Sequence, residues 1–528
     1  MIRQELKELI KNSIKELQKE KVLLFSIPEI KLEFSKIKEH GDYATNISLI
    51  SSPLFKENPI ELAEKLKKKI EKDKMIEKIE IKKPGFLNFF ISHKKFQDEL
   101  KKALEKGKDF GNLTRKKTKK VQVEFISANP TGPLTLGNGR GGFCGDILAN
   151  VLDKAGFNVE REYYVNDIGE QIKKLGHSVL GDDEAVYKGE YIEELKKRIK
   201  NKDPEKAGIE AANIVLEEII KPDVQLMGIN FDKWFSERSL YENNKIEKSF
   251  EFLKNKELTY QKDGALWFKS SSFGDDKDRV LIKKGGEKTY FASDIAYIKD
   301  KFDRGFNSLI YIWGADHYGY IGRMKAAAVA LGYKKGQIEI IIMQLVRLIK
   351  EGKIVKMSKR KGEYVTLKEL VDEVGLDVAR FFFIQRGAGT HLDFDLSLAK
   401  ERSEKNPVFY TQYAYARACS ILKKSKLEEE NLKINNLKML SDPSEIELLK
   451  QILRFPEIIE DTALDYQVQK VPNYALELTS SFHRFYHDCR VISEDEGISQ
   501  ARHLLIVAFK NVLKNTFDLM GISSPEKM

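Results

Sequence analysis

Residues 121–165 read VQVEFISANPTGPLTLGNGRGGFCGDILANVLDKAGFNVEREYYV, and this stretch decides the fold class. The short β-branched run at 121–126 predicts a buried strand, and a loop rich in glycine and proline follows it. Residues 143–157 then show the apolar spacing of a helix, and 158–165 form a second strand candidate. Strand, loop, helix and strand make a βαβ unit. Such a unit predicts a parallel sheet whose ligands bind beyond the carboxyl ends of its strands.

The loop at 127–142 has a composition that suits phosphate binding. It lies where a strand feeds a helix, so its backbone can approach a ligand closely and the helix N-terminus adds partial positive charge. It lacks the GK[ST] of a P-loop and the usual register of GxGxxG. From the residues alone, a nucleotide site and an ordinary tight turn both stay open. The glycines of the loop are Gly132, Gly137, Gly139, Gly141 and Gly142.

Outward from this unit the texture of the chain changes twice, which predicts three domains. The 528 residues suit that number at roughly 100 to 200 residues per domain. We expect an α+β domain at 1–112, a Rossmann-type parallel-sheet domain at 113–394 with inserted helices near 187–226, and an all-α bundle at 395–528.

Composition narrows the class of protein. Lys and Arg number 91 against 81 Asp and Glu, and the net charge of +10 favours a polyanionic partner, although a solubility surplus also fits. No apolar run approaches the roughly 18 residues that span a bilayer, so no membrane contact is expected. The cysteines are far apart and support neither a disulfide framework nor a thiolate zinc site, which predicts a cytoplasmic protein. They are Cys144, Cys419 and Cys489.

A second loop, KIVKMSKRKGEYVTL at 353–367, gathers lysines around a serine. Lysines are mobile point charges that can follow a departing phosphate, while a solvated surface loop is the alternative. Two such loops in one α/β domain, separated by an insertion, indicate two sides of one polyphosphate site.

These loops resemble signatures of a known family. KMSKR matches the KMSK loop of class I aminoacyl-tRNA synthetases, and ANPTGPLTLGN at 128–138 resembles their HIGH signature in the version found in arginyl-tRNA synthetases. Segment 391–417 resembles the passage into that family's anticodon-binding domain, so the resemblance covers essentially the whole chain. Further matching segments are HGDYATN (40–46), PGFLNFF (84–90), YVNDIGEQI (164–172), TYFASDIAY (289–297) and IWGADHYGY (312–320).

The resemblance implies ATP-dependent ligation of L-arginine to the 3′ end of tRNA(Arg) through an arginyl-adenylate, with release of AMP and pyrophosphate, in protein synthesis. It implies a Rossmann-type catalytic domain with an N-terminal α+β additional domain and a C-terminal all-α anticodon-binding bundle. Mg²⁺ is expected to accompany ATP as substrate. We expect no tightly bound cofactor or permanent metal, because no acidic or histidine cluster is found, and we expect a monomer.

The implied catalytic residues lie in the two loops. Thr135 and Asn138 stand where the family usually has histidines; either can donate a hydrogen bond to a nucleotide oxygen, but neither carries a full positive charge. Gly137 is expected to leave room for adenine or ribose, and Lys356 and Lys359 to contact pyrophosphate. The full motifs are Ala128, Asn129, Pro130, Thr131, Gly132, Pro133, Leu134, Thr135, Leu136, Gly137 and Asn138, and Lys356, Met357, Ser358 and Lys359.

Arginine selection needs carboxylates for a planar guanidinium with five donors. Tyr290 and Asp294 lie four residues apart and share a face if helical. An ordinary strand-end or surface charge is the alternative for the acidic residues. The family's arginine site maps onto Glu124, Asn129, Tyr290 and Asp294, and we expect Asp316, with His317 as an ATP contact, near the same cleft.

In the predicted bundle, Tyr410, Tyr413 and Arg417 have helical spacing and could stack on anticodon bases, or else form bundle core. Two rival functions stand beside the implied one. A class I synthetase for lysine, glutamate or cysteine fits the terminal domains and the acidic pair less well. A catalytically silent tRNA-binding protein is disfavoured by the intact KMSK sequence.

Overall fold

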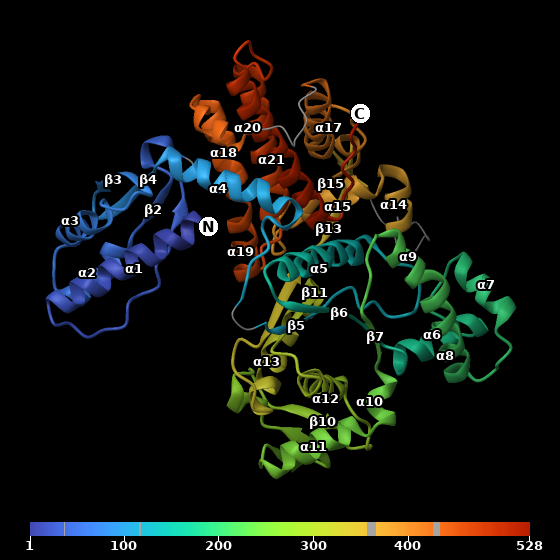
Figure 1. The fold of residues 1–528 in the computed structure, drawn as a ribbon. Coiled ribbons are helices and arrows are strands. Elements are labelled where there is room, and N and C mark those ends of the chain that lie inside the picture. Colours follow the sequence, from blue (N-terminus) through green and yellow to red (C-terminus); the bar gives the residue numbers. More distant parts are fainter. Residues whose placement is uncertain (36, 116–117, 356–365, 426–432) are drawn as a thin grey trace.

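The computed structural model describes residues 1–35, 37–115, 118–355, 366–425 and 433–528. It has three parts: an N-terminal α+β unit, a central part built on a parallel sheet, and a C-terminal helical bundle (Figure 1). The predicted fold class is therefore confirmed. Within the described ranges, no helix is long and apolar enough to cross a membrane.

The N-terminal unit packs helices on an antiparallel sheet of strand order β1-β2-β4-β3. Asn58 caps one helix by accepting a hydrogen bond from the Ile60 amide (2.9 Å), and Pro59 occupies the first helical position, where no donor is needed. The elements are α1 (Ile2–Glu20), α2 (Ile47–Phe55), α3 (Pro59–Ile70), α4 (His93–Lys106), β1 (Glu33–Phe34), β2 (Tyr43–Thr45), β3 (Ile76–Lys82) and β4 (Phe86–Ile91).

The central sheet is parallel throughout, with strand order β12-β11-β5-β6-β7. The chain runs from β5 through α5 to β6 on one side and later returns to β11 on the other, so the order reverses at β5. Ligands of such sheets bind in the crevice beyond the carboxyl ends of the strands at that reversal. The elements are β5 (Lys120–Glu124), α5 (Leu136–Lys154), β6 (Asn158–Val165), β7 (Lys233–Ser236), β11 (Ser308–Gly314) and β12 (Ile338–Met343).

Helices and two small sheets surround this core. The helices inserted between β6 and β7 are α6 (Glu170–Leu180), α7 (Glu190–Arg198), α8 (Pro204–Val215) and α9 (Lys221–Leu226). Next come α10 (Arg238–Glu242), α11 (Lys245–Asn255), α12 (Tyr290–Asp303) and α13 (Ile321–Ala330), with an antiparallel sheet of β8 (Thr259–Lys262), β9 (Ala265–Phe268) and β10 (Arg279–Ile282). The last group is β13 (Val346–Lys350), β14 (Lys353–Ile354), α14 (Leu367–Val374), α15 (Leu376–Ile384), β15 (Leu392–Asp395) and α16 (Leu396–Ala399).

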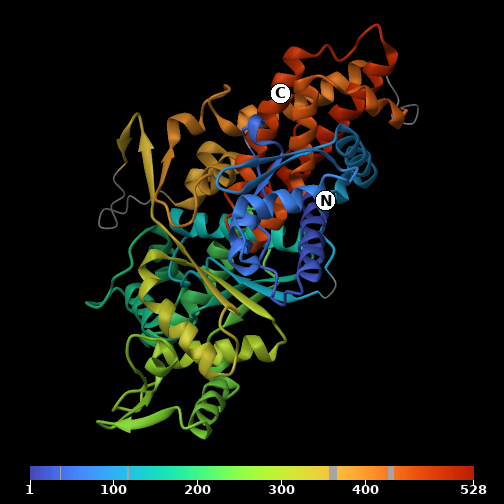
Figure 2. The ribbon, with the colours of Figure 1, turned by 90° about the vertical axis from the view of Figure 1, so that its left-hand side faces the viewer.

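The C-terminal bundle lies against both other parts (Figure 1, Figure 2). Buried Arg3 of α1 pairs with Asp461 (2.8 Å) and Glu460 (2.5 Å), and the Tyr43 hydroxyl donates to Glu457 (2.7 Å). These polar contacts join the N-terminal unit to the bundle. The bundle helices are α17 (Pro407–Ser425), α18 (Pro443–Leu453), α19 (Phe455–Asp465), α20 (Lys470–Asp488) and α21 (Glu496–Met520).

Candidate active site

The loop after β5 is strained where the strand ends. Ile126 and Ser127 both have positive φ angles, 64° and 42°, a region that a β-branched residue rarely adopts. Contacts to the next strand hold this conformation. The Ser127 hydroxyl accepts from the Tyr164 amide (3.1 Å), and the Tyr163 hydroxyl donates to the Ala128 carbonyl (2.9 Å). The loop therefore starts from a defined position at the carboxyl edge of the sheet.

Thr135 and Asn138 together cap the N-terminus of α5. The Asn138 side-chain oxygen accepts from the Thr135 amide (2.9 Å) and from the Thr135 hydroxyl (2.8 Å). This use of the oxygen leaves the Asn138 NH₂ group as the donor for a ligand. Thr135 and Gly137 are exposed, so a ligand can reach the positive end of the helix.

The glycines of the loop serve two different purposes. A Cβ at Gly139 would lie 2.5 Å from Leu367, and one at Gly142 would lie 2.5 Å from Met227. These two glycines allow α5 to pack closely against the side chains of Leu367 and Met227. They serve the packing of the helix and not the close approach of a ligand. Among the described residues, the Thr135 hydroxyl oxygen is the one atom within 4 Å of a Cβ built at Gly137, at 3.7 Å, so the described part of the chain leaves room there for a ligand.

Two other segments support the loop. The Leu134 amide donates to the Asp223 carboxylate on α9 (3.2 Å), and the Leu134 carbonyl accepts from the Leu367 amide (3.0 Å). Thr135 also forms an isolated β-bridge with Thr366. Lys356, Met357, Ser358 and Lys359 lie outside the described residues. Thr366 is the first described residue after this gap, and its bridge to Thr135 brings it into direct contact with the loop at 127–142, called the nucleotide loop below.

A group of carboxyls lies beside this loop. Burial and the nearby charges of Glu237 and Glu124 raise the pKa of Asp294 to about 7. Burial also raises the pKa of Glu237 to about 7, against the lowering effect of hydrogen bonds from Ser293 and Tyr164. Two neighbouring carboxyls that are costly to ionise provide a site that a cation would stabilise.

Glu237 was not predicted as a site residue from the sequence, although its position directly after a strand could have indicated it. It directly follows β7, at the same carboxyl edge of the sheet as Glu124. β7 has only four residues, KWFS, and so short a pattern does not predict a parallel strand. Glu237 is 3% exposed, and such a buried carboxylate needs partners or a cationic ligand.

Glu124 already has a partner within the fold. The Lys301 ammonium lies 2.5 Å from its carboxylate, and the Lys301 side chain is fully buried between the rings of Tyr297 and Tyr311, at 4.1 and 4.0 Å from their centroids. Lys301 therefore compensates the charge of Glu124 within the fold, and the assignment of Glu124 to the arginine site stays a prediction. Among the described residues, no lysine pairs with Asp294 or Glu237 as Lys301 pairs with Glu124, although the charges of Arg323 and Lys301 lower the pKa of Asp294.

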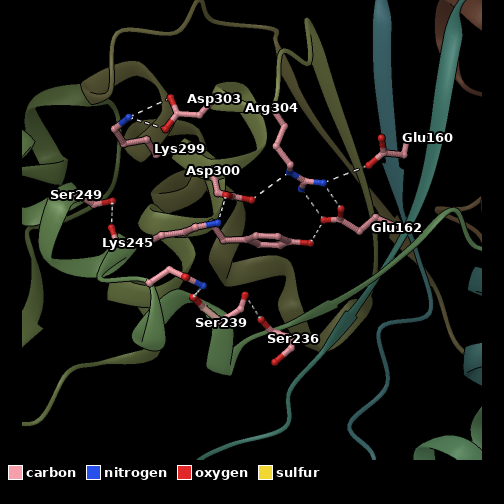
Figure 3. A network of polar contacts seen from close by, with 12 residues as sticks. Glu160, Glu162, Ser236, Ser239, Lys245, Ser249, Lys299, Asp300, Asp303 and Arg304 are labelled. Carbon is pink, nitrogen blue, oxygen red and sulfur yellow. Dashed lines mark hydrogen bonds and ion pairs between the residues drawn. The ribbon is translucent and has the colours of Figure 1, made fainter.

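A polar network at Asp300 and Arg304 (Figure 3) holds the C-terminal end of α12, the helix that also carries Asp294. Arg304 pairs with Glu162 on β6 (2.5 Å) and with Asp300 (3.1 Å), while Asp300 also accepts from Lys245 on α11 (2.5 Å). Tyr297 donates to Glu162 from the same helix. These contacts hold α12 against the sheet, so the position of the pocket carboxyls is set by the protein before any ligand binds.

The remaining predicted residues of the arginine and ATP sites are exposed. Tyr290 begins α12 one turn before Asp294 and is 52% exposed, and Asn129 is exposed. Asp316 and His317 are exposed after β11 and pair with each other at 3.5 Å. The His317 ring also contacts the rings of Trp313 and Tyr320, with centroids 5.7 and 5.9 Å apart.

Three comparisons agree with this geometry. Residues 4–91 match the family described as the arginyl tRNA synthetase N terminal domain, residues 99–179 and 175–383 match the class I (R) tRNA synthetase catalytic domain, and 411–528 match the DALR anticodon binding domain. The arginine–tRNA ligase of Caldanaerobacter subterraneus subsp. tengcongensis is 43% identical, over 100% of this chain and 99% of its own. The chain belongs to the arginyl-tRNA synthetase family.

Other relatives support the same membership of the arginyl-tRNA synthetases. The arginine–tRNA ligase of Bacillus subtilis is 45% identical, with 95% of each chain covered. The solved structure of the Thermus thermophilus arginyl-tRNA synthetase superposes with a TM-score of 0.81 over 100% of both chains. At 20% sequence identity, this similarity shows the shared fold alone.

Tyr410, Tyr413 and Arg417 are half-buried on α17, and the last two lie within the part matched by the DALR anticodon binding domain. Arg417 donates to the Tyr413 hydroxyl and lies over the Tyr486 ring, 5.0 Å from its centroid. The Tyr410 ring contacts His483, with centroids 5.0 Å apart. The three residues therefore share a face that packs on α20 and is partly open to solvent.

Proposed function

We propose that this chain ligates L-arginine to the 3′ end of tRNA(Arg), using ATP, in protein synthesis. The observation that carries this proposal is a pair of neighbouring carboxyls, half-buried Asp294 and buried Glu237, beside a nucleotide loop at the sheet reversal. A guanidinium carries one delocalised charge and five donors, and two carboxylates suit it better than one. Membership of the family agrees with this reading of the pocket.

The reaction has two steps. A carboxylate oxygen of arginine attacks the α-phosphorus of ATP, and the bond to the β-phosphate oxygen breaks, which releases pyrophosphate and leaves arginyl-adenylate. A ribose hydroxyl of the terminal adenosine then attacks the arginyl carbonyl, and AMP leaves. No covalent enzyme intermediate is required, so the protein acts by aligning groups and stabilising charge.

The nucleotide loop supplies that alignment. The Asn138 NH₂ group, the Thr135 hydroxyl and the N-terminus of α5 face the phosphates, and Gly137 leaves space beside them. Lys356 and Lys359 stabilise the departing pyrophosphate from the segment before Thr366, which contacts the loop. Mg²⁺ accompanies ATP as its counter-ion. Among the described residues, no three His, Cys, Asp or Glu side chains gather as metal ligands.

Arginine lies with its side chain toward the carboxyls and its α-carboxylate toward the nucleotide loop. Asp294 and Glu237 pair with the guanidinium, and Tyr290 closes the mouth of the pocket. Glu124 and Asn129, at the end of β5 and in the loop, face the α-ammonium group. Lysine and citrulline leave buried acceptors or donors unpaired, and such mismatches discriminate strongly.

The other two domains contact tRNA. Tyr410, Tyr413 and Arg417 offer rings and a cation on which anticodon bases stack. The N-terminal unit, within the proposed domain 1–112, adds a further RNA-contacting surface. The other two domains that we propose are the catalytic domain at 113–394 and the anticodon-binding domain at 395–528. We place the protein in the cytoplasm as a monomer.

A pyrophosphate-exchange assay tests this function. Each amino acid is supplied with ATP and labelled pyrophosphate, with and without tRNA(Arg). We expect exchange with arginine only, and only when tRNA is present. Exchange driven by lysine, glutamate or cysteine would overturn the proposed substrate, and exchange at the full rate without RNA would remove the tRNA requirement.

Arginine affinity is expected to fall at low pH. The empty pocket holds carboxyls with pKa values of about 7, and only their ionised forms pair with the guanidinium. Affinity is therefore present above pH 7 and is lost as pH falls through 7, by about tenfold between pH 8 and pH 6 for one carboxyl. Calorimetry in two buffers of different ionisation enthalpy checks this, because binding near pH 7 must release protons. A pH-independent affinity would contradict it.

Lys359→Ala is expected to lower the rate of adenylate formation about a hundredfold, with little change in arginine affinity. Its charge acts mainly as pyrophosphate departs, so removing it weakens the transition state more than the ground state. Single-turnover adenylate formation measures the rate, with Lys353→Ala as a control at an exposed residue of β14. An unchanged rate would remove this lysine from the mechanism.

A further inference from the structure

Four segments of the chain meet at one buried arginine, Arg380 of α15, which is 1% exposed. Its Nε donates to the Met520 carbonyl at the end of α21 (2.6 Å), and its Nη1 donates to the Met227 carbonyl after α9 (2.7 Å). Its Nη2 pairs with the Asp146 carboxylate on α5. One guanidinium therefore connects the bundle to two supports of the nucleotide loop.

The end of α21 closes tightly on this arginine. Gly521 has a φ of 64°, and a Cβ there would lie 2.4 Å from Nη2 of Arg380. The Asn150 amide of α5 donates to the neighbouring Leu519 carbonyl (3.0 Å). The last carbonyls of a helix lack partners within the helix, so here α5 and α15 satisfy them. The joint is specific in geometry, because a planar fork holds three acceptors at once.

Two routes lead from Arg380 to the nucleotide loop. Along α5, Asp146 lies ten residues after Leu136, about 15 Å at 1.5 Å per residue, and the helix begins at the cap formed by Thr135. Along α9, Met227 follows the helix whose Asp223 accepts from the Leu134 amide (3.2 Å). Arg380 is therefore connected through α9 to Leu134 and through α5 to Thr135. Figure 1 shows α5 lying between the bundle and the sheet.

We propose that Arg380 is a positioning residue that holds the nucleotide loop in register with the tRNA-binding bundle. This inference rests on the proposed function. Arg380 touches no substrate and acts through α5 and α9. When the joint is loosened, arginine, ATP and tRNA still bind their own surfaces, but the loop no longer aligns the α-phosphorus with the attacking carboxylate. The loss therefore falls on turnover rather than on binding.

Arg380→Lys tests the proposal, because lysine keeps the charge beside Asp146 but cannot also reach both carbonyls. We expect kcat of arginine-dependent exchange, with saturating tRNA(Arg), to fall at least about tenfold. KM for arginine and for ATP, and Kd for tRNA, are expected to stay within about twofold. Thermal unfolding is recorded in parallel.

Arg502→Lys is the matched control. Arg502 pairs with Glu445 (2.6 Å) and donates to the Arg490 carbonyl (2.7 Å), and all three residues lie within the bundle. Both changes replace a guanidinium that pairs with one carboxylate and donates to backbone carbonyl oxygen, but only Arg380 lies at the joint. An equal fall in kcat for both variants, or an unchanged kcat for Arg380→Lys, would overturn the proposal. A raised KM for both arginine and ATP in Arg380→Lys would also overturn the proposal.

Gly521→Ala provides a second test if Arg380→Lys unfolds at the assay temperature. It crowds the guanidinium from the bundle side without removing any charge, so the same loss of kcat with preserved KM is expected. Unchanged turnover in this variant would overturn the role of the joint. Failure of the proposed function looks different, since the unmodified protein would then show no exchange with arginine at all.

Discussion

We expect Asp294→Asn to raise the KM for arginine by a factor of several hundred at pH 8 and to change the KM for ATP less than twofold. The substitution keeps the shape of the side chain, removes its charge and turns an amide NH₂ toward a ligand that is itself a donor. A buried charge that loses its partner costs about 3 to 5 kcal/mol, which corresponds to a factor of hundreds or more in affinity. ATP is held by the nucleotide loop and does not depend on this carboxylate.

Steady-state titration of each substrate measures the effect. Asp303→Asn is the matched control, because Asp303 lies on the same helix in an exposed pair with Lys299 (2.8 Å). Exposed pairs of this kind contribute little, so the control keeps the arginine KM of the parent protein. Equal weakening for arginine and ATP would show that Asp294 supports the fold instead of reading the side chain. Glu237→Gln is expected to repeat the arginine-specific loss.

Lys301→Met is expected to destabilise the central part of the protein by about 3 to 5 kcal/mol. The substitution fills a similar volume but leaves the buried Glu124 carboxylate without its 2.5 Å partner. Urea unfolding followed by tryptophan fluorescence measures this destabilisation, because the three tryptophans, Trp234, Trp267 and Trp313, all lie in the central part.

The double variant Lys301→Met with Glu124→Gln separates the charge from the packing. Removing both charges is expected to recover most of the lost stability, since a neutral pair needs no compensation. Lys299→Met serves as the control, at a partly exposed lysine of the same helix, and costs less than about 1 kcal/mol. A double variant as unstable as the single one would assign the loss to packing around the Tyr297 and Tyr311 rings.

Much of the fold follows from local sequence. The βαβ unit at 121–165 is present as β5, α5 and β6, because strand and helix periodicities are set by neighbouring residues. Thr135 and Asn138 lie at the helix N-terminus for the same reason. The pairing of Tyr290 with Asp294 on one face also follows from spacing, once α12 is a helix.

The compensation of charge does not follow from local sequence. Lys301 reads as one more lysine in a charged helix, yet it is fully buried against Glu124, 177 residues away. Glu237 follows a strand too short to be recognised, and Arg380 meets Asp146 across 234 residues. No periodicity within a segment records which distant group will neutralise a charge.

The sequence by itself determined the order of the elements, the place of the nucleotide loop and the resemblance that named the family. These depend on the spacing of residues along the chain, and spacing is visible without coordinates. Only the tertiary structure decided that Glu124 is compensated by Lys301, that Asp294 and Glu237 are the pocket's acidic pair, and that Arg380 joins the bundle to the loop. The physical reason is that the energy of a buried charge depends on its surroundings in space, and folding brings those surroundings from distant parts of the chain.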